Sequence, residues 1–160
     1  MQKINADEMP WEAYFSPKKT VGGYGKPLSE ALGRKPNSTD LLERHPFDVE
    51  IQRIPPGMPA TVYHSHSAQW EFYHVLSGSG SVRDAHGITP IGAGDTFLCK
   101  PGDAHQLRGG DGPEDLVVIC VADNPIGESQ YYHDSKKYGV REPERVLVRG
   151  EAVDYWDDEE

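Results

Sequence analysis

The sequence predicts an all-β fold, and three observations carry that prediction. Apolar residues alternate with polar ones over short runs, first at Phe47, Val49 and Ile51. Comparable runs continue to Asp123 and are separated by turn sequences such as SGSG, DAHG, GAGD and PGD. The chain also contains 17 Gly and 13 Pro without a regular period, which indicates many turns. Short strands without room for crossover helices are typical of an antiparallel sandwich or barrel.

The length of 160 residues fits one compact domain with short extensions. Residues 1–45 are interrupted by Pro or Gly every few positions, so we expect an extended N-terminal arm. Its aromatic residues Trp11, Tyr14 and Phe15 are expected to dock on the main body or on a second subunit. Residues 46–125 are predicted to form the barrel, and residues 126–160 a C-terminal extension with an acidic tip.

Composition excludes several classes of partner. The net charge of −10 would repel a phosphate backbone, so we expect no nucleic-acid binding. No run reaches the roughly 18 to 20 apolar residues of a membrane span, and the N-terminus lacks a signal peptide's apolar block. We therefore expect no membrane association and a cytoplasmic location. Cys99 and Cys120 lie in apolar runs and are predicted to be buried, reduced thiols.

A cluster of metal-ligating residue types stands in the segment YHSHSAQWEFYH, residues 63–74. His64 and His66 are two apart on a predicted strand, so both project from one face, about 7 Å apart. Glu71 starts the next strand after a four-residue connection, and a hairpin would return its carboxylate to the histidines. His105 follows a tight PGD turn that can aim it inward.

Three histidines and one carboxylate suit one divalent transition metal such as Zn, Mn, Ni or Fe, and six-coordination would leave two positions open. A single His in a strand is more often a packing or surface residue. The agreement of four positions on two separate turn-bounded segments favours the metal site.

These residues resemble a known family. Gly57 to Gly78, GMPATVYHSHSAQWEFYHVLSG, resembles the first cupin motif, and GDTFLCKPGDAHQL from Gly94 resembles the second, with Lys100 at the usual proline position. The resemblance implies a jelly-roll barrel of the double-stranded β-helix type over about residues 47–122. It also implies a metal held by His64, His66, Glu71 and His105, and a homodimer.

Three further residues are candidates for contacts with a small-molecule substrate. Strand alternation puts Tyr73 on the Glu71 face, where it could act as a general acid or simply fill the barrel. Arg53 shares the parity of Phe47, Val49 and Ile51, so its guanidinium is expected in the interior, paired with a protein carboxylate or an anionic substrate. Gln69 is placed for a hydrogen bond beside Glu71.

The segment YYHDSKKYGV and the closing DYWDDEE extend the resemblance to small, sugar-phosphate-isomerase-like cupins. That resemblance implies a metal-dependent isomerase that moves a proton between neighbouring carbons. The sequence offers no clear general base. Two alternatives remain open: an Fe(II)-dependent dioxygenase using the open coordination positions, and a cupin that binds a small metabolite without turnover.

Overall fold

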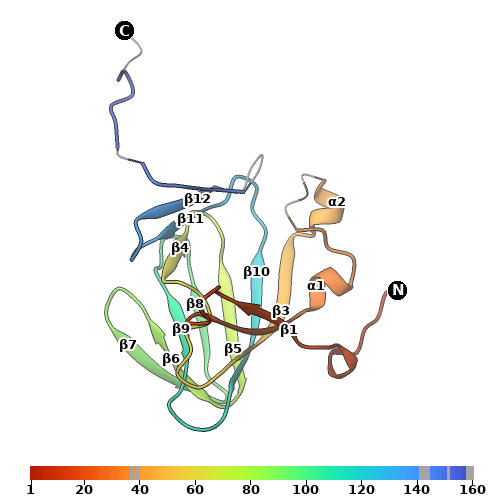
Figure 1. Ribbon diagram of the computed structural model, residues 1–160. Coiled ribbons are helices and arrows are strands. Elements are labelled where there is room, and N and C mark those ends of the chain that lie inside the picture. Colours follow the sequence, from red (N-terminus) through yellow and green to blue (C-terminus); the bar gives the residue numbers. More distant parts are fainter. Residues whose placement is uncertain (37, 39, 141–144, 151, 158–160) are drawn as a thin grey trace.

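The protein is described by a computed structural model that covers residues 1–160 except 37, 39, 141–144, 151 and 158–160. The described residues form a mostly antiparallel β-structure, and the all-β prediction is confirmed (Figure 1). The elements are η1 (Ala6–Glu8), β1 (Glu12–Phe15), β2 (Gly22–Pro27), α1 (Leu28–Ala31), α2 (Leu41–Arg44), β3 (Phe47–Ile54), β4 (His64–His66), β5 (Glu71–Ser77), β6 (Ser79–Arg83), β7 (Ile88–Gly92), β8 (Thr96–Cys99), β9 (Gln106–Gly109), β10 (Leu116–Asp123), β11 (Ser129–Tyr132), β12 (Lys137–Val140) and β13 (Val146–Val148).

Three sheets build the jelly-roll barrel. The largest has the strand order β1-β2-β3-β10-β5-β8, and the other two have the orders β13-β12-β11-β4 and β7-β6-β9. The two smaller sheets are joined where the backbones of His64 and His105 hydrogen-bond to each other, with N···O distances of 3.2 and 2.8 Å. Side chains from the large sheet and from the joined pair therefore meet in one interior.

The barrel core is apolar and is built by alternate residues of the long strands. On β10 the buried positions alternate strictly with half-buried ones, as expected for a strand with one face in a core. The buried cluster consists of Ile54, Ala60, Tyr73, Val75, Ile91, Cys99, Leu107, Leu116, Val118 and Cys120. The two cysteines are buried and free, which confirms their prediction as reduced thiols.

The N-terminal arm lies against its own barrel. β2 pairs with β3, and β1 pairs with β2, so the arm widens the large sheet by two strands. Phe15 packs edge to face on Tyr24 at 5.3 Å between ring centroids. Glycine is required at Gly22, where φ is +136° and a Cβ would lie 2.1 Å from the Tyr14 carbonyl oxygen.

The expected C-terminal extension also contributes strands. β11 pairs with β4, and β12 and β13 continue that sheet outward (Figure 1). Residues that follow the motif region thus flank the strand that carries His64 and His66. Residues 158–160 of the expected acidic tip lie outside the described residues. Across the described part of the chain, no helix is long and apolar enough to cross a membrane.

Candidate metal centre

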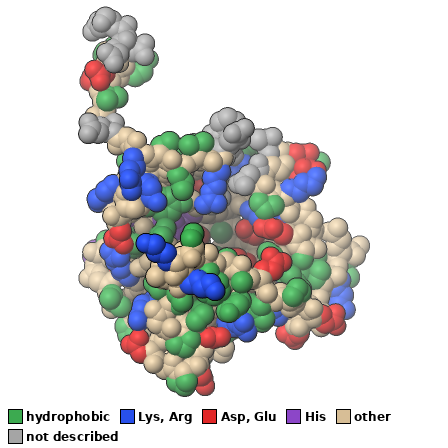
Figure 2. Space-filling model, in the orientation of Figure 1, with side chains coloured by type: hydrophobic (Ala, Val, Ile, Leu, Met, Phe, Trp, Pro, Cys, Tyr) green, Lys and Arg blue, Asp and Glu red, His purple; other side chains and the backbone are tan. Residues whose placement is uncertain are grey.

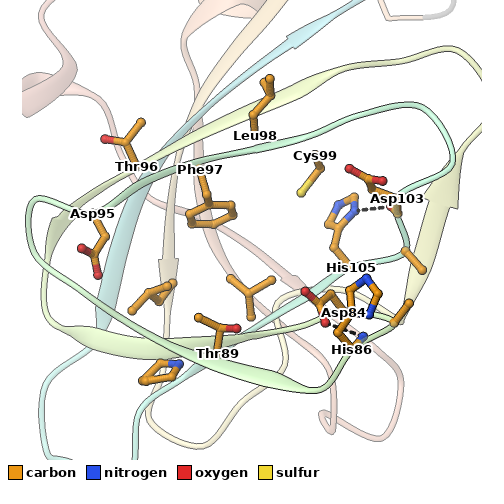
Figure 3. Close-up of a pocket in the computed structure, with 15 residues that line it drawn as sticks. Asp84, His86, Thr89, Asp95, Thr96, Phe97, Leu98, Cys99, Asp103 and His105 are labelled. Carbon is orange, nitrogen blue, oxygen red and sulfur yellow. Dashed lines mark hydrogen bonds between the residues drawn. The ribbon is translucent and has the colours of Figure 1, made fainter.

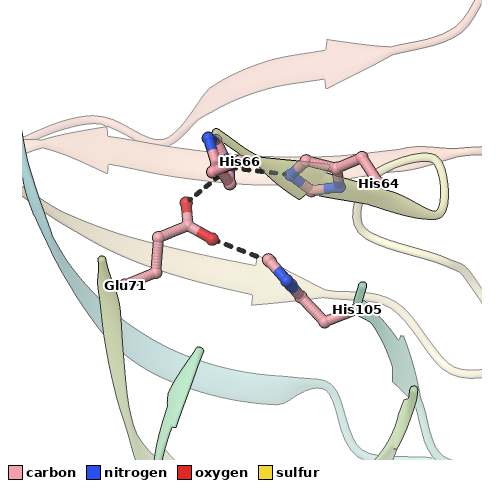
Figure 4. Close-up of side chains that lie close together, drawn as sticks. All are labelled: His64, His66, Glu71 and His105. Atoms are coloured by element: carbon pink, nitrogen blue, oxygen red, sulfur yellow. Dashed lines mark hydrogen bonds and ion pairs between the residues drawn. The ribbon is translucent and has the colours of Figure 1, made fainter. Parts of the chain in front are cut away.

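The four predicted ligands converge in the barrel interior (Figure 4). Their ligand atoms all lie within 4.8 Å of one another. Nε2 of His64 lies 3.1 Å from Nε2 of His66, and the two Glu71 oxygens lie 3.5 Å from His66 Nε2 and 2.7 Å from His105 Nε2. Metal–nitrogen bonds of about 2.0–2.1 Å place neighbouring ligand atoms roughly 3 Å apart. The cluster therefore has the dimensions of a single-ion site.

The expected hairpin between the histidines and Glu71 is wrong. β4 pairs with β11, whereas β5 pairs with β10 and β8, so His66 and Glu71 lie on different sheets. The connection of residues 67–70 crosses from one layer to the other instead of folding back. Glu71 therefore meets the histidines across the barrel interior, and the site depends on the packing of the two layers.

Each histidine is oriented by a contact on its other ring nitrogen. Nδ1 lies 2.8 Å from the Val62 carbonyl oxygen in His64, 3.0 Å from Glu128 Oε1 in His66, and 3.1 Å from the Asp103 carbonyl oxygen in His105. Because these oxygens are acceptors, each Nδ1 donates, and in the neutral ring the lone pair stands on Nε2. The three lone pairs face the shared centre.

When the rings are neutral and Nδ1 carries the proton, the Nε2 atoms of the three histidines are acceptors that face one another. Two lone pairs 3.1 Å apart, on His64 and His66, cannot hydrogen-bond to each other. Nε2 of buried His105 lies 2.7 Å from Glu71 Oε2, and a hydrogen bond between these two atoms requires that Nε2 carry a proton. A shared divalent cation satisfies all three nitrogens and the carboxylate, so these residues fit a metal of the Zn, Mn, Ni or Fe type.

The charges within the cluster are strongly coupled. Burial would raise the pKa of Glu71, but His105 and His66 outweigh burial and hold it well below its usual range. Burial also lowers the pKa of His64, to about 4, with help from the other two histidines. Burial would lower the pKa of His105 too, but Cys99 and the Glu71 carboxylate raise it to about 10. Glu71 is thus an anion at neutral pH, and a metal would displace a proton from His105.

Tyr73 lies on the Glu71 face of β5, as strand alternation predicts, and it is buried. Its hydroxyl donates to Glu71 Oε2 at 3.3 Å, and its ring stacks on Phe97 at 5.0 Å between centroids. Burial raises the pKa of the hydroxyl well above its usual value. Tyr73 therefore combines a packing role with a hydrogen bond that orients the carboxylate, and its action on a substrate stays a prediction.

Arg53 lies elsewhere, and its expected position inside the barrel is wrong. Its guanidinium lies over the rings of Trp11 and Tyr24, at 4.7 and 4.5 Å, and 3.5 Å from Asp115 Oδ2. The inward residues of β3 are instead Gln52 and Ile54. The parity argument failed because the arm covers the outer face of β3, so apolar residues occur on both faces.

Gln69 is buried and lies next to the centre. Its side-chain amide donates to the Asp123 carbonyl oxygen, and its side chain borders a cavity that Glu71 also borders. A contact between Gln69 and a substrate stays a prediction.

Three cavities border residues of the cluster, and one of them, of about 350 Å³, includes only His66 of the four. A second, of about 260 Å³, here called the Glu71 cavity, is lined by Glu30, Arg34, Pro36, Asp48, Glu50, Gln69, Glu71, Cys120, Ala122 and Arg145. The third, of about 520 Å³, is bordered by β7 and β8 and reaches His105 and Cys99 (Figure 3). Figure 2 shows a hollow below β11 and β12, with histidine atoms in its depth and acidic side chains along one side. The Glu71 cavity contains guanidinium groups, whereas the largest of the three has no Lys or Arg among its described lining residues.

Sequence reasoning missed two acidic residues at this site. Glu50 faces the Glu71 cavity from β3, and the alternating polar residues Asp48, Glu50 and Gln52 were the signal that could have found it. Glu128 contacts His66 from outside both motifs, and no local pattern marks it. Glu128 reaches His66 because β11 pairs with β4, a contact between segments far apart in the sequence.

The comparisons with known proteins agree with this description. The family model for the cupin domain matches residues 50–122. The fold and the His/His/Glu/His cluster define a barrel with an internal candidate metal site, and residues 50–122 of that barrel are similar to the cupin domain.

Individual relatives vary in how much they share. A provisionally assigned sugar phosphate isomerase from Acidithiobacillus ferrooxidans is 25% identical, with a TM-score of 0.77 and 92% of each chain covered. A cupin-superfamily sugar phosphate isomerase from Silicibacter pomeroyi is 21% identical, with a TM-score of 0.75 and coverage of 96% of this chain and 98% of its own, which shows the shared fold. The oxalate-binding protein of Thermotoga maritima is 32% identical over 69 residues, which is 43% of this chain and 55% of that protein's length.

Proposed function

We propose that the protein is a metal-dependent isomerase acting on a sugar phosphate or a similar metabolite. The observation that carries this proposal is the composition of the Glu71 cavity. The cavity combines the candidate ligand Glu71, the carboxylate of Glu50, which forms no ion pair among the described residues, and the guanidinium groups of Arg34 and Arg145. The resemblance over nearly the whole chain to the Acidithiobacillus ferrooxidans protein supports the same reaction class.

A bound divalent ion would supply polarisation of a carbonyl and an adjacent hydroxyl oxygen. Moving a proton between neighbouring carbons also requires a base that is not engaged with the ion. Glu71 faces the histidines with both oxygens, and the Tyr73 hydroxyl donates to it, so neither is free for this role.

Glu50 is the residue best placed to carry the proton. Cys120 pairs with Glu50 on one side and with Tyr73 on the other, and the next inward residue of β10, Ala122, pairs with Glu71. Two strand spacings of about 4.8 Å therefore separate the backbones of β3 and β5, which leaves room for a small substrate between the two carboxylates. The Gln52 amide donates to Glu50, and among the described residues no cation forms an ion pair with it.

The environment of Glu50 suits proton exchange near neutrality. Burial raises its pKa to about 7. A general base is most effective when its pKa lies near the working pH. Asp48, in the same cavity, is paired with Arg34 at 3.2 Å, so its carboxylate is less available as a general base.

Two guanidinium groups could neutralise an anionic substrate in this cavity. Arg34 is buried and already contacts Asp48 and Glu30, while Arg145 is exposed at the border of the cavity. Together with a divalent ion, they would balance the four carboxylates of the lining. Such a balance would admit a phosphate-bearing substrate despite the net charge of −10.

The test is isomerisation and solvent-deuterium exchange, followed by NMR, of a panel of aldose and ketose phosphates with protein loaded with Zn, Mn, Ni or Fe(II). Glu50→Gln should lose about 10²- to 10⁴-fold in kcat while keeping its metal. Asp48→Asn makes the same charge change in the same cavity and should keep most of the activity. Absence of exchange by the loaded wild type with every metal and sugar would overturn the proposal.

Two other functions would give different results in the same samples. An Fe(II)-dependent dioxygenase would consume oxygen with iron alone. Binding without turnover is favoured by one observation, the 32% identity of the barrel region to an oxalate-binding protein. In that case oxalate should bind the metal-loaded protein in a calorimeter, and no sugar phosphate should react.

The homodimer stays a prediction. Phe72 of β5 and Leu98 of β8 pair in register on the outer face of the large sheet and are 40% and 47% exposed. A second copy would cover these side chains. Light scattering after size-exclusion chromatography would contradict the dimer if it gave a monomer mass.

A further inference from the structure

Glu128 is a buried carboxylate outside the matched cupin region. It directly precedes β11, and its side chain is 0% exposed. A buried carboxylate is costly unless hydrogen bonds or opposite charges compensate it. Among the described residues, the hydrogen-bond partners of Glu128 all belong to residues 66–69, the segment that starts at one candidate ligand and leads to another.

The two carboxylate oxygens divide this segment between them. Oε1 accepts from His66 Nδ1 at 3.0 Å and from the Ser67 amide at 3.2 Å. Oε2 accepts from the amides of Ala68 and Gln69, each at 2.9 Å, and from the Ser67 hydroxyl at 3.3 Å. These hydrogen bonds hold the pKa of Glu128 below its usual range, although burial alone would raise it.

A carboxylate is an acceptor only, so it selects the form of the His66 ring. The contact at Oε1 is satisfied only when His66 carries its proton on Nδ1. The ring then presents Nε2, whose neighbours are His64 Nε2 at 3.1 Å and Glu71 Oε1 at 3.5 Å. Through Oε2, the same side chain fixes the turn that carries the chain from β4 to Glu71.

We propose that Glu128 is a positioning residue of the candidate metal centre. Through it, the segment that follows the barrel and leads into β11 sets the metal affinity of the centre. Glu128 keeps His66 in the metal-binding tautomer, and it keeps Glu71 at the distance from His66 that a shared ion requires. The role extends the centre beyond the cupin motifs, since residues 50–122 contain all four ligands but not the group that orients His66.

Glu128→Gln separates this role from simple tethering. A glutamine has one acceptor oxygen and one NH₂ group. If the NH₂ group faces His66, it favours the tautomer with the proton on Nε2, which cannot bind a metal through Nε2, the atom that faces the centre. Ser67→Ala is the matched control, because it removes a hydrogen bond to Oε2 and one from the Ser129 amide but leaves His66 Nδ1 in contact with Oε1.

The experiment measures Zn²⁺ affinity of the full-length chain by competition with a chelator, together with urea unfolding of the chelator-treated protein. Loss of an outer partner of a metal-bound histidine typically weakens binding about 10- to 100-fold. We expect that loss in Glu128→Gln and wild-type affinity in Ser67→Ala. In ¹H–¹⁵N spectra of the Zn-loaded protein, the His66 Nδ1–H signal should be protected in wild type and Ser67→Ala and lost in Glu128→Gln.

Equal Zn²⁺ affinity in Glu128→Gln and Ser67→Ala would overturn the proposal. It would also be overturned if both variants lost the same stability without metal and the loss of Zn²⁺ affinity only followed that loss of stability. If Glu128→Gln does not fold, Glu128→Asp replaces it. The aspartate keeps the acceptor but withdraws it by one methylene, so affinity should fall and the His66 signal should weaken. Wild-type affinity in Glu128→Asp would then refute the requirement for contact with His66.

Discussion

The two ends of the barrel interior are built by the same strands but differ in character. Along the inner face of β5 the side chains run from Glu71 through Tyr73 to Val75, and along β3 from Glu50 through Gln52 to Ile54. Val75 and Ile54 are completely buried at the apolar end, whereas Glu71 and Glu50 border a cavity at the polar end. Apolar core residues therefore gather at one end and the candidate metal ligands at the other, with Tyr73 between them.

Removing a ligand at the polar end should produce the largest effect. Glu71→Ala should lower metal affinity by more than the 10- to 100-fold that an outer partner contributes. Metal content of dialysed protein, measured by plasma mass spectrometry, checks this. Chelator-treated Glu71→Ala should still show a cooperative unfolding transition, and an unfolded variant would contradict the division into two ends.

A cavity at the apolar end should have the opposite consequence. Leu116 is fully buried and lies opposite Ile54 in the sheet register. Leu116→Ala should lower the free energy of unfolding by about 2–5 kcal/mol in urea titrations. Metal content per folded molecule should stay at the wild-type value, and a parallel loss of metal would show that the two ends are coupled.

Metal binding at the polar end should depend on pH in one direction. Because the pKa of His105 is raised to about 10 and that of Glu71 is held low, the metal-free site carries a proton at neutral pH that binding must release. Burial would lower the pKa of His66, but its contacts with Glu128 and Glu71 raise that pKa as well. Affinity should therefore rise at least about tenfold per pH unit from pH 7 towards pH 9, since at least the His105 proton is exchanged. Calorimetry in two buffers of different ionisation enthalpy counts the proton, and identical heats in both would contradict the prediction.

Substitution of Glu50 should give the smallest of these effects, a change in how the free energy of unfolding depends on pH. Its pKa is raised by burial from 4.5 to about 7, so the folded state binds the proton more tightly than the unfolded state. That contribution is lost as the pH rises from about 4.5 to about 7. Glu50→Gln should therefore be more stable relative to wild type at pH 8 than at pH 5.

Urea titrations of both proteins at the two pH values check this prediction. Asp48→Asn is the control, because Asp48 is paired with Arg34 and its loss should not stabilise the protein at pH 8. Parallel pH profiles for wild type and Glu50→Gln would contradict the assignment.

The sequence alone determined the all-β class, the buried reduced cysteines and the identity of the four clustered residues. It did so because alternation, turn residues and motif spacing are local properties of the chain. His64, His66, Glu71 and His105 could be found in this way, since each lies at a fixed distance from a glycine turn.

The tertiary structure decided how those residues meet and what surrounds them. Glu71 reaches the histidines across two layers, and Arg53 faces the arm. Glu128 contacts His66 from a position 62 residues later in the chain, directly before β11. Each of these depends on which elements cover a given face, and strand parity cannot reveal that when both faces of a strand are buried. The four candidate ligands could therefore be found from local sequence patterns, whereas the groups that orient them could not.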